Sequence, residues 1–379
     1  HTRYSLQSRG LGDVYKRQDV PNVRVDCFAM YTNNAPSGAF RGFGVTQSCF
    51  AVESNMDMLA GKLGLDPVEF RRINALDVGS VTSTGQVLRE SVGLIECIDR
   101  VDRDMRSDDF RWTWDEGDRR FAWGLAVGYK NTGLGGGAPD KASADVDVWR
   151  DAAGTVSAEV RTSSAEMGQG LPAVLAACVA EELQIPSSAV NVLLGDTDFC
   201  PDGGPTTASR QTFVSGNAAR LAAREAAQQF ANAGPGQKIS VRYDYEAPAT
   251  QPLGSGGDMH FAFGFCAQAA LCEVDMKTGE VHVRRIIAAH DVGRAINPLT
   301  LAGQIEGGIV MCIGYTLTEH YIQEQGMPWT NVMARYKMPS IIHTPAISSH
   351  IVEHNTSTGP YGAKGVGELP SIPTSAAIT

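Results

Sequence analysis

Five turns rich in glycine and other small residues, each directly ahead of a segment with helical periodicity, constrain the fold of this chain more than any other feature. They comprise residues 38–44, 166–170, 205–209, 293–298 and 362–368. The first turn of a helix leaves backbone N–H groups unpaired and carries a partial positive charge, so such a turn can bind an anion. A single turn of this kind is usually an ordinary cap. Five in one chain indicate a large polar or phosphorylated ligand held by backbone groups.

The last of these turns ends on a carboxylate, Glu368, which is followed by Leu369 and Pro370. Gly365 and Gly367 carry no Cβ that would keep the backbone away from a bound reactant, and the proline fixes the exit of the loop. Glu368 is therefore predicted to approach a ligand closely and with little conformational freedom. A general base needs this kind of presentation.

Hydrophobic periodicity predicts both helices and strands. Helices are expected over residues 47–63, 171–183 and 209–230, and strands over residues 144–149, 155–162, 239–245 and 281–289. The charged stretch 102–120, which contains two tryptophans, is expected to be a linker over the surface. The chain is therefore predicted to be an α+β protein with two subdomains of mixed sheets and packed helices, residues 19–101 and 121–379.

The two ends of the chain are unusual. Residues 1–18 show neither helical nor strand periodicity and resemble adapter-derived sequence, so we predict a leader that is not native. Residues 375–379 begin a helical pattern that stops after its first turns. We therefore expect the chain to be a fragment, truncated at its C-terminus.

Charge and cysteine content exclude several function classes. The chain has 32 Lys and Arg against 42 Asp and Glu, a formal net charge of −10, so nucleic acid is not an expected partner. The eight cysteines form no CxxC pair and several lie in apolar helical patterns, which indicates buried thiols in a reducing compartment. The longest nearly uncharged stretch, residues 307–318, is too short to cross a bilayer. We predict a soluble cytoplasmic protein without membrane contact.

The chain contains other residues that could suggest catalytic motifs, but ordinary structural roles explain them better. The histidines form no HExxH motif or Cys/His cluster, so no protein-ligated zinc or iron is expected. Residues 133–138 match the spacing of a dinucleotide-binding loop, but Pro139 and a strand pattern follow them where a helix is required. Glu166 is expected to be a helix N-terminal carboxylate more than an acid catalyst. His290 and Asp291 are expected to end a strand more than to form half of a triad.

The five turns resemble, in order and approximate spacing, those of the molybdopterin-binding subunit of the xanthine dehydrogenase and aldehyde oxidoreductase family. The matching segments are GAFRGFG at 38–44 with Gln47, EMGQG at 166–170, 196–197 with PTTAS at 205–209, 291–293 with 297–298, and GAKGVGE at 362–368. The resemblance runs from about residue 19 to the end and corresponds to roughly the second half of such a subunit. It implies that residues 19–101 end the first molybdopterin-binding subdomain and that residues 121–379 form the second.

The resemblance implies a pyranopterin molybdenum cofactor, attached through its dithiolene and not by a protein side chain. It implies that Glu368 is the general base, which takes the proton of Mo–OH while that oxygen attacks an electron-poor carbon and hydride passes to Mo=S. Phe43 would form an aromatic wall against the substrate. The residues implied in cofactor binding are Arg41, Gly42, Gly168, Gln169, Gly170, Thr207, Ala208, Ser209, Val366 and Gly367.

The resemblance leaves the small-molecule substrate open between an aldehyde and an N-heterocycle such as a purine. Residues 130–133 align loosely with a position where purine-acting members tend to carry a Phe-Thr pair, which weakens the case for xanthine. The cysteine loop of carbon monoxide dehydrogenases is absent between Ala39 and Gln47. Because no Fe–S cysteine spacing occurs, 2Fe–2S and FAD centres are expected on other segments or subunits of an oligomer. The nucleotide form of the cofactor, such as a cytosine dinucleotide, stays open. The alternative is a non-catalytic relative that binds molybdopterin or another anion.

Overall fold

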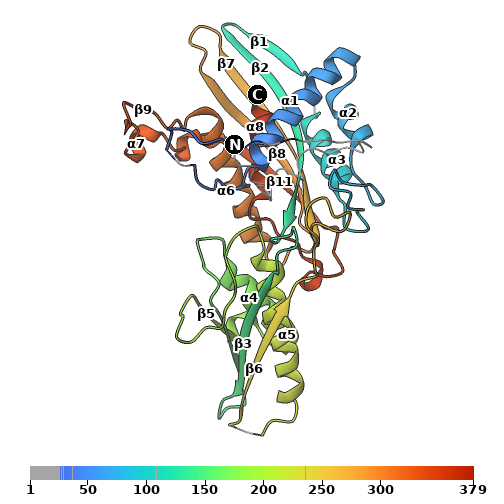
Figure 1. Cartoon of the computed structure of the whole chain (residues 1–379), viewed down its shortest axis with the longest axis vertical. Helices are drawn as coiled ribbons and strands as arrows, with labels where there is room; N and C mark the ends of the chain where they lie inside the picture. Colours follow the sequence, from blue (N-terminus) through green and yellow to red (C-terminus); the bar gives the residue numbers. More distant parts are fainter. Residues whose placement is uncertain (1–25, 27, 29, 36, 107–108, 235) are drawn as a thin grey trace.

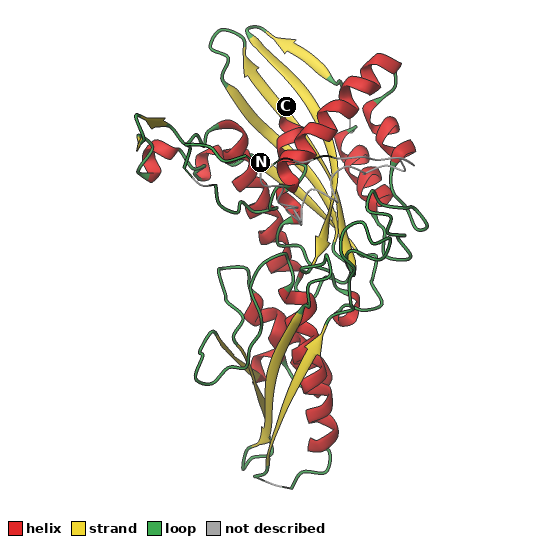
Figure 2. Ribbon diagram, in the orientation of Figure 1, coloured by secondary structure: helices red, strands yellow, loops and turns green. Residues whose placement is uncertain are grey.

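The computed structural model describes residues 26–379, apart from residues 27, 29, 36, 107–108 and 235. The leader predicted over residues 1–18 lies outside the described residues. The described elements form two units, a larger one at the top of Figure 1 and a smaller one below it. Figure 2 shows that long loops gather where the two units meet.

A five-stranded sheet forms the centre of the larger unit. Its strands, in spatial order, are β1 (Thr113–Glu116), β2 (Arg119–Thr132), β7 (Ala262–Asp275), β8 (Val281–Asp291) and β11 (Ala346–Val352). All neighbours are antiparallel except β8 and β11, which are parallel. The strand predicted over residues 281–289 is therefore confirmed as β8.

Helices cover both faces of this sheet. One face packs against α2 (Pro67–Asn74) and α3 (Leu94–Met105), and the other against α1 (Val45–Leu63), α6 (Pro298–Leu317) and α8 (Thr374–Ile378). Val127 of β2 belongs to the first of these cores, whereas its neighbour Ala126 belongs to the second. The helix predicted over residues 47–63 is confirmed as α1, which ends at Gly64 in the left-handed conformation.

The segment 102–120 does not form the predicted linker. It contains the last turn of α3, the whole of β1 and the start of β2. Val101 and Met105 of α3 share one core with Leu125 and Phe265 of the sheet. The helices before this segment and the strands after it therefore belong to a single packed unit, because the apolar face of α3 is buried against β7 and β8.

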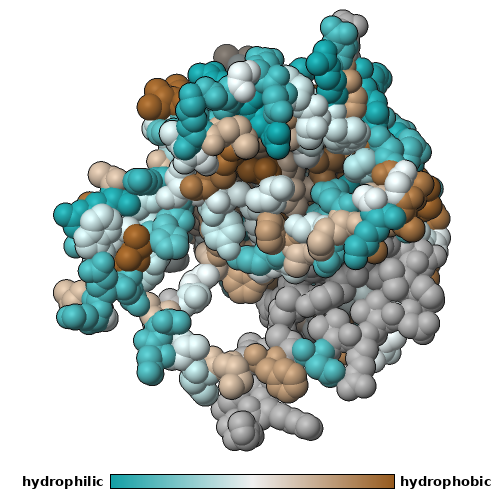
Figure 3. All heavy atoms as spheres, turned by 90° about the horizontal axis from the view of Figure 1, so that it is seen from above, coloured by the Kyte–Doolittle hydropathy of each residue, from teal (hydrophilic) through white to brown (hydrophobic). Residues whose placement is uncertain are grey.

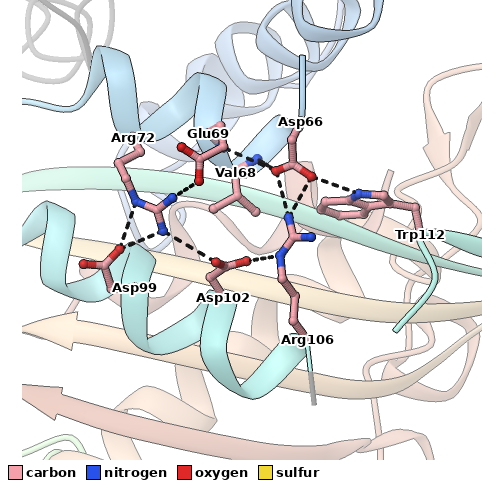
Figure 4. Close-up of polar contacts among 8 residues, drawn as sticks. All are labelled: Asp66, Val68, Glu69, Arg72, Asp99, Asp102, Arg106 and Trp112. Atoms are coloured by element: carbon pink, nitrogen blue, oxygen red, sulfur yellow. Dashed lines mark hydrogen bonds and ion pairs between the residues drawn. The ribbon is translucent and has the colours of Figure 1, made fainter. Parts of the chain in front are cut away.

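An ion-pair network fixes α2 to α3, as Figure 4 shows. Asp66 accepts hydrogen bonds from the first amides of α2 and pairs with Arg106 at 2.7 Å. Arg72 of α2 pairs with Asp99 at 2.8 Å, and Asp102 lies between the two arginines. Burial favours a higher pKa for Asp66, but its hydrogen bonds from Arg106 and from the α2 amides outweigh burial and lower the pKa.

The smaller unit is a four-stranded sheet covered on one face by two helices. Its strands, in spatial order, are β5 (Val190–Leu194), β4 (Val156–Thr162), β3 (Lys141–Arg150) and β6 (Lys238–Glu246), and its helices are α4 (Leu171–Leu183) and α5 (Gln211–Phe230). The apolar residues of β3 at 144, 146 and 148 face the helices. The alternate residue Asp147 pairs with Arg161 and Lys238 on the other face. All predicted elements in this part are confirmed, with α5 beginning two residues later than expected.

The remaining elements are short. They are η1 (Ser187–Ala189), β9 (Gln323–Glu324), β10 (Met327–Pro328), α7 (Met333–Tyr336), η2 (Ile341–His343), η3 (Pro360–Gly362) and η4 (Leu369–Ser371). The segment with β9 and α7 projects to the left of the sheet in Figure 1. Seen from above in Figure 3, apolar side chains lie in separate clusters within a mainly hydrophilic surface. No helix in the described part of the chain is long and apolar enough to span a membrane.

Candidate active site

Glu368 lies at the end of a loop that follows the edge of the large sheet. The amide of Lys364 donates to the carbonyl of Val292 at 2.8 Å, just beyond β8. One residue later, the amide of Gly365 donates to Oγ1 of Thr132 at 2.9 Å, at the end of β2. These contacts carry the loop across the end of the sheet, so that Glu368 is placed where the larger unit meets the smaller one.

Ser209, ahead of α5 in the smaller unit, holds Glu368 from the opposite side. Its Oγ accepts a hydrogen bond from the Glu368 amide at 2.9 Å and lies 3.5 Å from the Glu368 carboxylate. Ala208 and Ser209 both have positive φ, 50° and 53°. Two consecutive non-glycine residues in the left-handed region store conformational strain, which is common at functional sites. A Cβ on Gly365 would lie 2.8 Å from the Cβ of Ser209, so only glycine allows this approach.

Arg41 connects the first turn to the last. Its Nε donates to the carbonyl of Gly367, and its Nη2 donates to the carbonyl and the Oε1 of Gln304 in α6, both at 3.1 Å. Burial lowers the pKa of the Arg41 guanidinium, and the charge of Glu368 opposes that shift. Next to it, Gly42 has φ of 105° and packs against η4, where a Cβ would lie 3.3 Å from the Oγ of Ser371.

A lysine that the sequence analysis did not place in the site also contacts Glu368. The Nζ of Lys130, near the end of β2, lies 3.2 Å from Oε2 of Glu368. The Lys130 side chain is 5% exposed and that of Glu368 is 15% exposed. The signal in the sequence is one charged residue at the end of the apolar run of β2. Its partner lies 238 positions further along the chain, so periodicity could not identify the pair.

The turn at residues 166–170 differs from the prediction of free backbone donors. The Glu166 carboxylate accepts hydrogen bonds from the amides of Gly168, Gly170 and Leu171, at 2.6, 3.0 and 2.7 Å. Gln169 folds back onto its own turn and donates to the carbonyl of Ala165. Glu166 therefore caps α4, as the sequence predicts. The amides of Gly168 and Gly170 become available to a ligand only when this carboxylate moves away.

The five turns form one continuous set of contacts, although they come from both units. The Ala165 amide donates to Oγ1 of Thr206 at 2.9 Å, which joins the second turn to the third. A Cβ on Gly170 would lie 3.0 Å from Thr300, which brings the second turn against the start of α6 and hence the fourth turn. The amide of Arg294 in the fourth turn donates to the carbonyl of Gly362 in the fifth at 3.1 Å. Arg41 and Ser209 then connect the first and third turns to Glu368.

The predicted site residues divide into a buried and an exposed group. Arg41, Gly42, Ser209, Gly367 and Glu368 are buried or half-buried. Arg41 bonds to Gly367 and Ser209 bonds to Glu368, whereas Gly42 packs beside Ser371. Ala208 and Val366 are half-buried, and Val366 packs against the core of the large unit. The exposed group consists of Phe43, Gly168 and Thr207, with Gln169 and Gly170 half-buried beside them. Phe43 is 55% exposed, so its aromatic face is open to a ligand.

Asp291 supports the active-site loop and is not half of a catalytic triad. It pairs with Lys364 at 2.6 Å, both side chains being fully buried, and accepts hydrogen bonds from the amides of Gly93 and Gly293. Burial lowers the pKa of Lys364, and Asp291 opposes that shift. Burial also lowers the pKa of the neighbouring His290 to about 3. Residues 290 and 291 thus end β8 as predicted.

The fold and the joined turns define a molybdopterin-binding protein. A family model for a molybdopterin cofactor-binding domain matches residues 97–235 and 228–345, and a second model of the same description matches residues 3–75. The chain belongs to the family of molybdopterin-binding subunits that includes xanthine dehydrogenases and aldehyde oxidoreductases.

Individual relatives agree with this family. The chain is 31% identical over 429 residues to the 6-hydroxypseudooxynicotine dehydrogenase complex subunit gamma of Paenarthrobacter nicotinovorans, covering 97% of the chain and 51% of that protein. It is 31% identical to the xanthine dehydrogenase molybdenum-binding subunit of Escherichia coli O157:H7, covering 92% and 51%. The crystal structure of the aldehyde oxidoreductase from Desulfovibrio desulfuricans superposes with a TM-score of 0.85 at 28% identity, covering 98% and 42%. The chain thus spans about half the length of these relatives.

Proposed function

We propose that this chain is the catalytic part of a molybdenum hydroxylase, an oxidoreductase that hydroxylates an electron-poor carbon of an aldehyde or N-heterocycle with oxygen derived from water. The observation that carries the proposal is the position of Glu368, a single carboxylate that contacts Ser209 and Lys130. It directly follows Gly367, whose carbonyl accepts a hydrogen bond from Arg41. The bound molybdopterin would supply an electrophilic metal and accept an electron pair from the substrate.

The residues around Glu368 fit a cofactor that brings its own metal ligands. Within the described part of the chain, no group of three or more His, Cys, Asp and Glu side chains could hold a metal ion. The turns present glycines, hydroxyls and backbone groups instead, with the amides of Gly168 and Gly170 bonded to Glu166. The residues that would hold the cofactor are Arg41, Gly42, Gly168, Gln169, Gly170, Thr207, Ala208, Ser209, Val366 and Gly367.

The side chains of this site have distinct tasks in the proposed reaction. Glu368 accepts the proton of the water-derived hydroxyl, so it must be ionised before the reaction. Ser209 fixes the backbone of Glu368 by accepting a hydrogen bond from its amide. Arg41 fixes the preceding residue by donating a hydrogen bond to the carbonyl of Gly367. Phe43, which is exposed, would lie against the flat face of an aromatic or conjugated substrate.

Replacement of the base tests this proposal. In the cofactor-loaded protein, Glu368→Gln should lower turnover by about 10²–10⁴-fold, because general-base catalysis contributes that much, while the molybdenum content stays unchanged. Glu306→Gln, on the exposed face of α6, is the matched control and should leave both quantities unchanged. Full turnover in Glu368→Gln would refute the role. A wild-type protein that holds molybdenum but oxidises neither aldehydes nor N-heterocycles would support the non-catalytic alternative.

We further propose that 2Fe–2S and FAD centres on other segments or subunits accept the electrons. The described residues include seven cysteines, six of them buried and dispersed among the cores, and no Fe–S ligand spacing. The relative from Paenarthrobacter is named as one subunit of a complex, which supports this proposal. An oligomer in the cytoplasm remains a prediction.

A further inference from the structure

Lys130 is a buried cation that neither the motifs nor the proposed proton transfer explains. Its side chain is 5% exposed, and its Nζ lies 3.2 Å from Oε2 of Glu368. Its Nζ also donates to Oδ1 of the adjacent Asn131, whose amide group in turn donates to the carbonyl of Gly133 at 2.8 Å. A lysine is rarely buried to this extent unless a charged group is its partner. The partner here is the carboxylate assigned as the general base.

We propose that Lys130 is a positioning residue that directs the Glu368 carboxylate before each turnover. This inference rests on the proposed role of Glu368. A charge-assisted contact of 3.2 Å between side chains that are 5% and 15% exposed holds the carboxylate in one orientation. The ammonium also occupies one side of Oε2, so it restricts rotation of the carboxylate about its terminal bond.

The surroundings of Glu368 show why Lys130 supplies this charge and other groups do not. The charged groups of the described elements that face Glu368 are Lys130 of β2 and Arg41 ahead of α1. Arg41 donates its Nε to the carbonyl of Gly367 and its Nη2 to Gln304, so these hydrogen bonds go to other groups. Ser209 is neutral, and its Oγ accepts a hydrogen bond from the Glu368 amide. Among the described residues, the ion pair of Glu368 is therefore with Lys130.

The kinetic constants of the cofactor-loaded protein test the inference. Replacing Lys130 with Met keeps the volume of the side chain and removes its charge. Because a misplacement of about 1 Å can cost about 10²-fold in rate, Lys130→Met should lower kcat by about 10–100-fold with little change in KM. Lys130→Arg should restore most of the lost kcat. Lys141→Met, which removes a surface lysine that pairs with Glu246 at 3.1 Å, is the control and should leave both constants unchanged.

A double-mutant cycle on the chain without cofactor provides a second readout that does not depend on activity. Lys130→Met should lower Tm because it leaves the buried Glu368 carboxylate without its cation, and much of that loss should disappear in Lys130→Met with Glu368→Gln. Additive changes in Tm, together with an unchanged kcat in Lys130→Met, would overturn the inference. A Lys130→Met variant that fails to fold, and is not rescued by Glu368→Gln, would likewise overturn it. Full turnover in Glu368→Gln would refute only the proposed function, since the double-mutant cycle still measures the coupling between Lys130 and Glu368.

Discussion

Gly365 is the position where a single methyl group should do most damage to the site. A Cβ there would lie 2.8 Å from the Cβ of Ser209 and closer still to its carbonyl oxygen, whereas ordinary contact begins at 3.4 Å. Backbone atoms cannot rotate away as a flexible side chain can. The loop in Gly365→Ala must therefore move by at least about 0.6 Å away from Ser209.

This displacement has two measurable consequences. The hydrogen bond from the Glu368 amide to Ser209, now 2.9 Å, would lengthen to at least about 3.5 Å, at which it is largely lost. Overpacking of this kind costs about 1–3 kcal/mol, which should lower Tm by several degrees. Because a misplacement of about 1 Å can cost about 10²-fold in rate, turnover of the loaded enzyme should fall roughly 10–100-fold.

Two further alanine variants calibrate the experiment. Gly367→Ala places a Cβ 3.3 Å from the Ser209 hydroxyl, which can rotate, so its loss of Tm should be smaller than that of Gly365→Ala. Gly61→Ala, on the exposed face of α1 with no atom within 4 Å, should raise stability by about 1 kcal/mol because alanine favours a helix. Equal Tm values for Gly365→Ala and wild type would refute the steric argument.

Two other predictions concern buried charge. Lys364→Met should cost about 3–5 kcal/mol in urea unfolding because it leaves Asp291 buried without its cation, and adding Asp291→Asn should recover part of that loss; a cost below about 1 kcal/mol would contradict the assignment. The pKa of Asp147 is lowered to about 2, since its hydrogen bonds from Arg161 and Lys238 outweigh burial. A depressed carboxyl pKa stabilises the fold above the unfolded value near 4 and loses that effect as the pH falls towards 2. Asp147→Asn should therefore be less stable than wild type at pH 7, with a difference that shrinks between pH 4 and pH 2; a difference independent of pH would refute this linkage.

Local patterns in the sequence predicted the smaller unit well and the larger unit only in part. In β3, apolar residues alternate with charged ones, because one face packs on helices and the other carries ion pairs. The central strand β7 lacks that alternation because helices bury both of its faces, so periodicity could not distinguish it from other apolar segments. The segment 102–120 was wrongly assigned to a linker for a similar reason. Asp102 of α3 pairs with Arg72 of α2, and Arg106 pairs with Asp66 at the start of α2, which a linear pattern does not show.

The features of the site likewise divide into those that local sequence predicted and those that depend on long-range contacts. Glycine spacing and the lone carboxylate were sufficient to select Glu368 and the five turns, because tight turns impose local constraints on residue type. Lys130 and the occupation of the Gly168 and Gly170 amides by Glu166 depend on atoms that meet only in the folded chain. The roles assigned to the individual site residues remain proposals that the variants above test.

The meeting of turns from both units at Glu368 has a thermodynamic consequence for the whole molecule. Ser209 reaches this point from the small sheet, and Arg41 and Gly367 reach it from the large one. A ligand that contacts both units stabilises their association by its binding free energy, since separating the units would release the ligand. Bound cofactor would then hold the two units together. The resistance of the loops between them to proteolysis would therefore report occupancy without any measurement of catalysis.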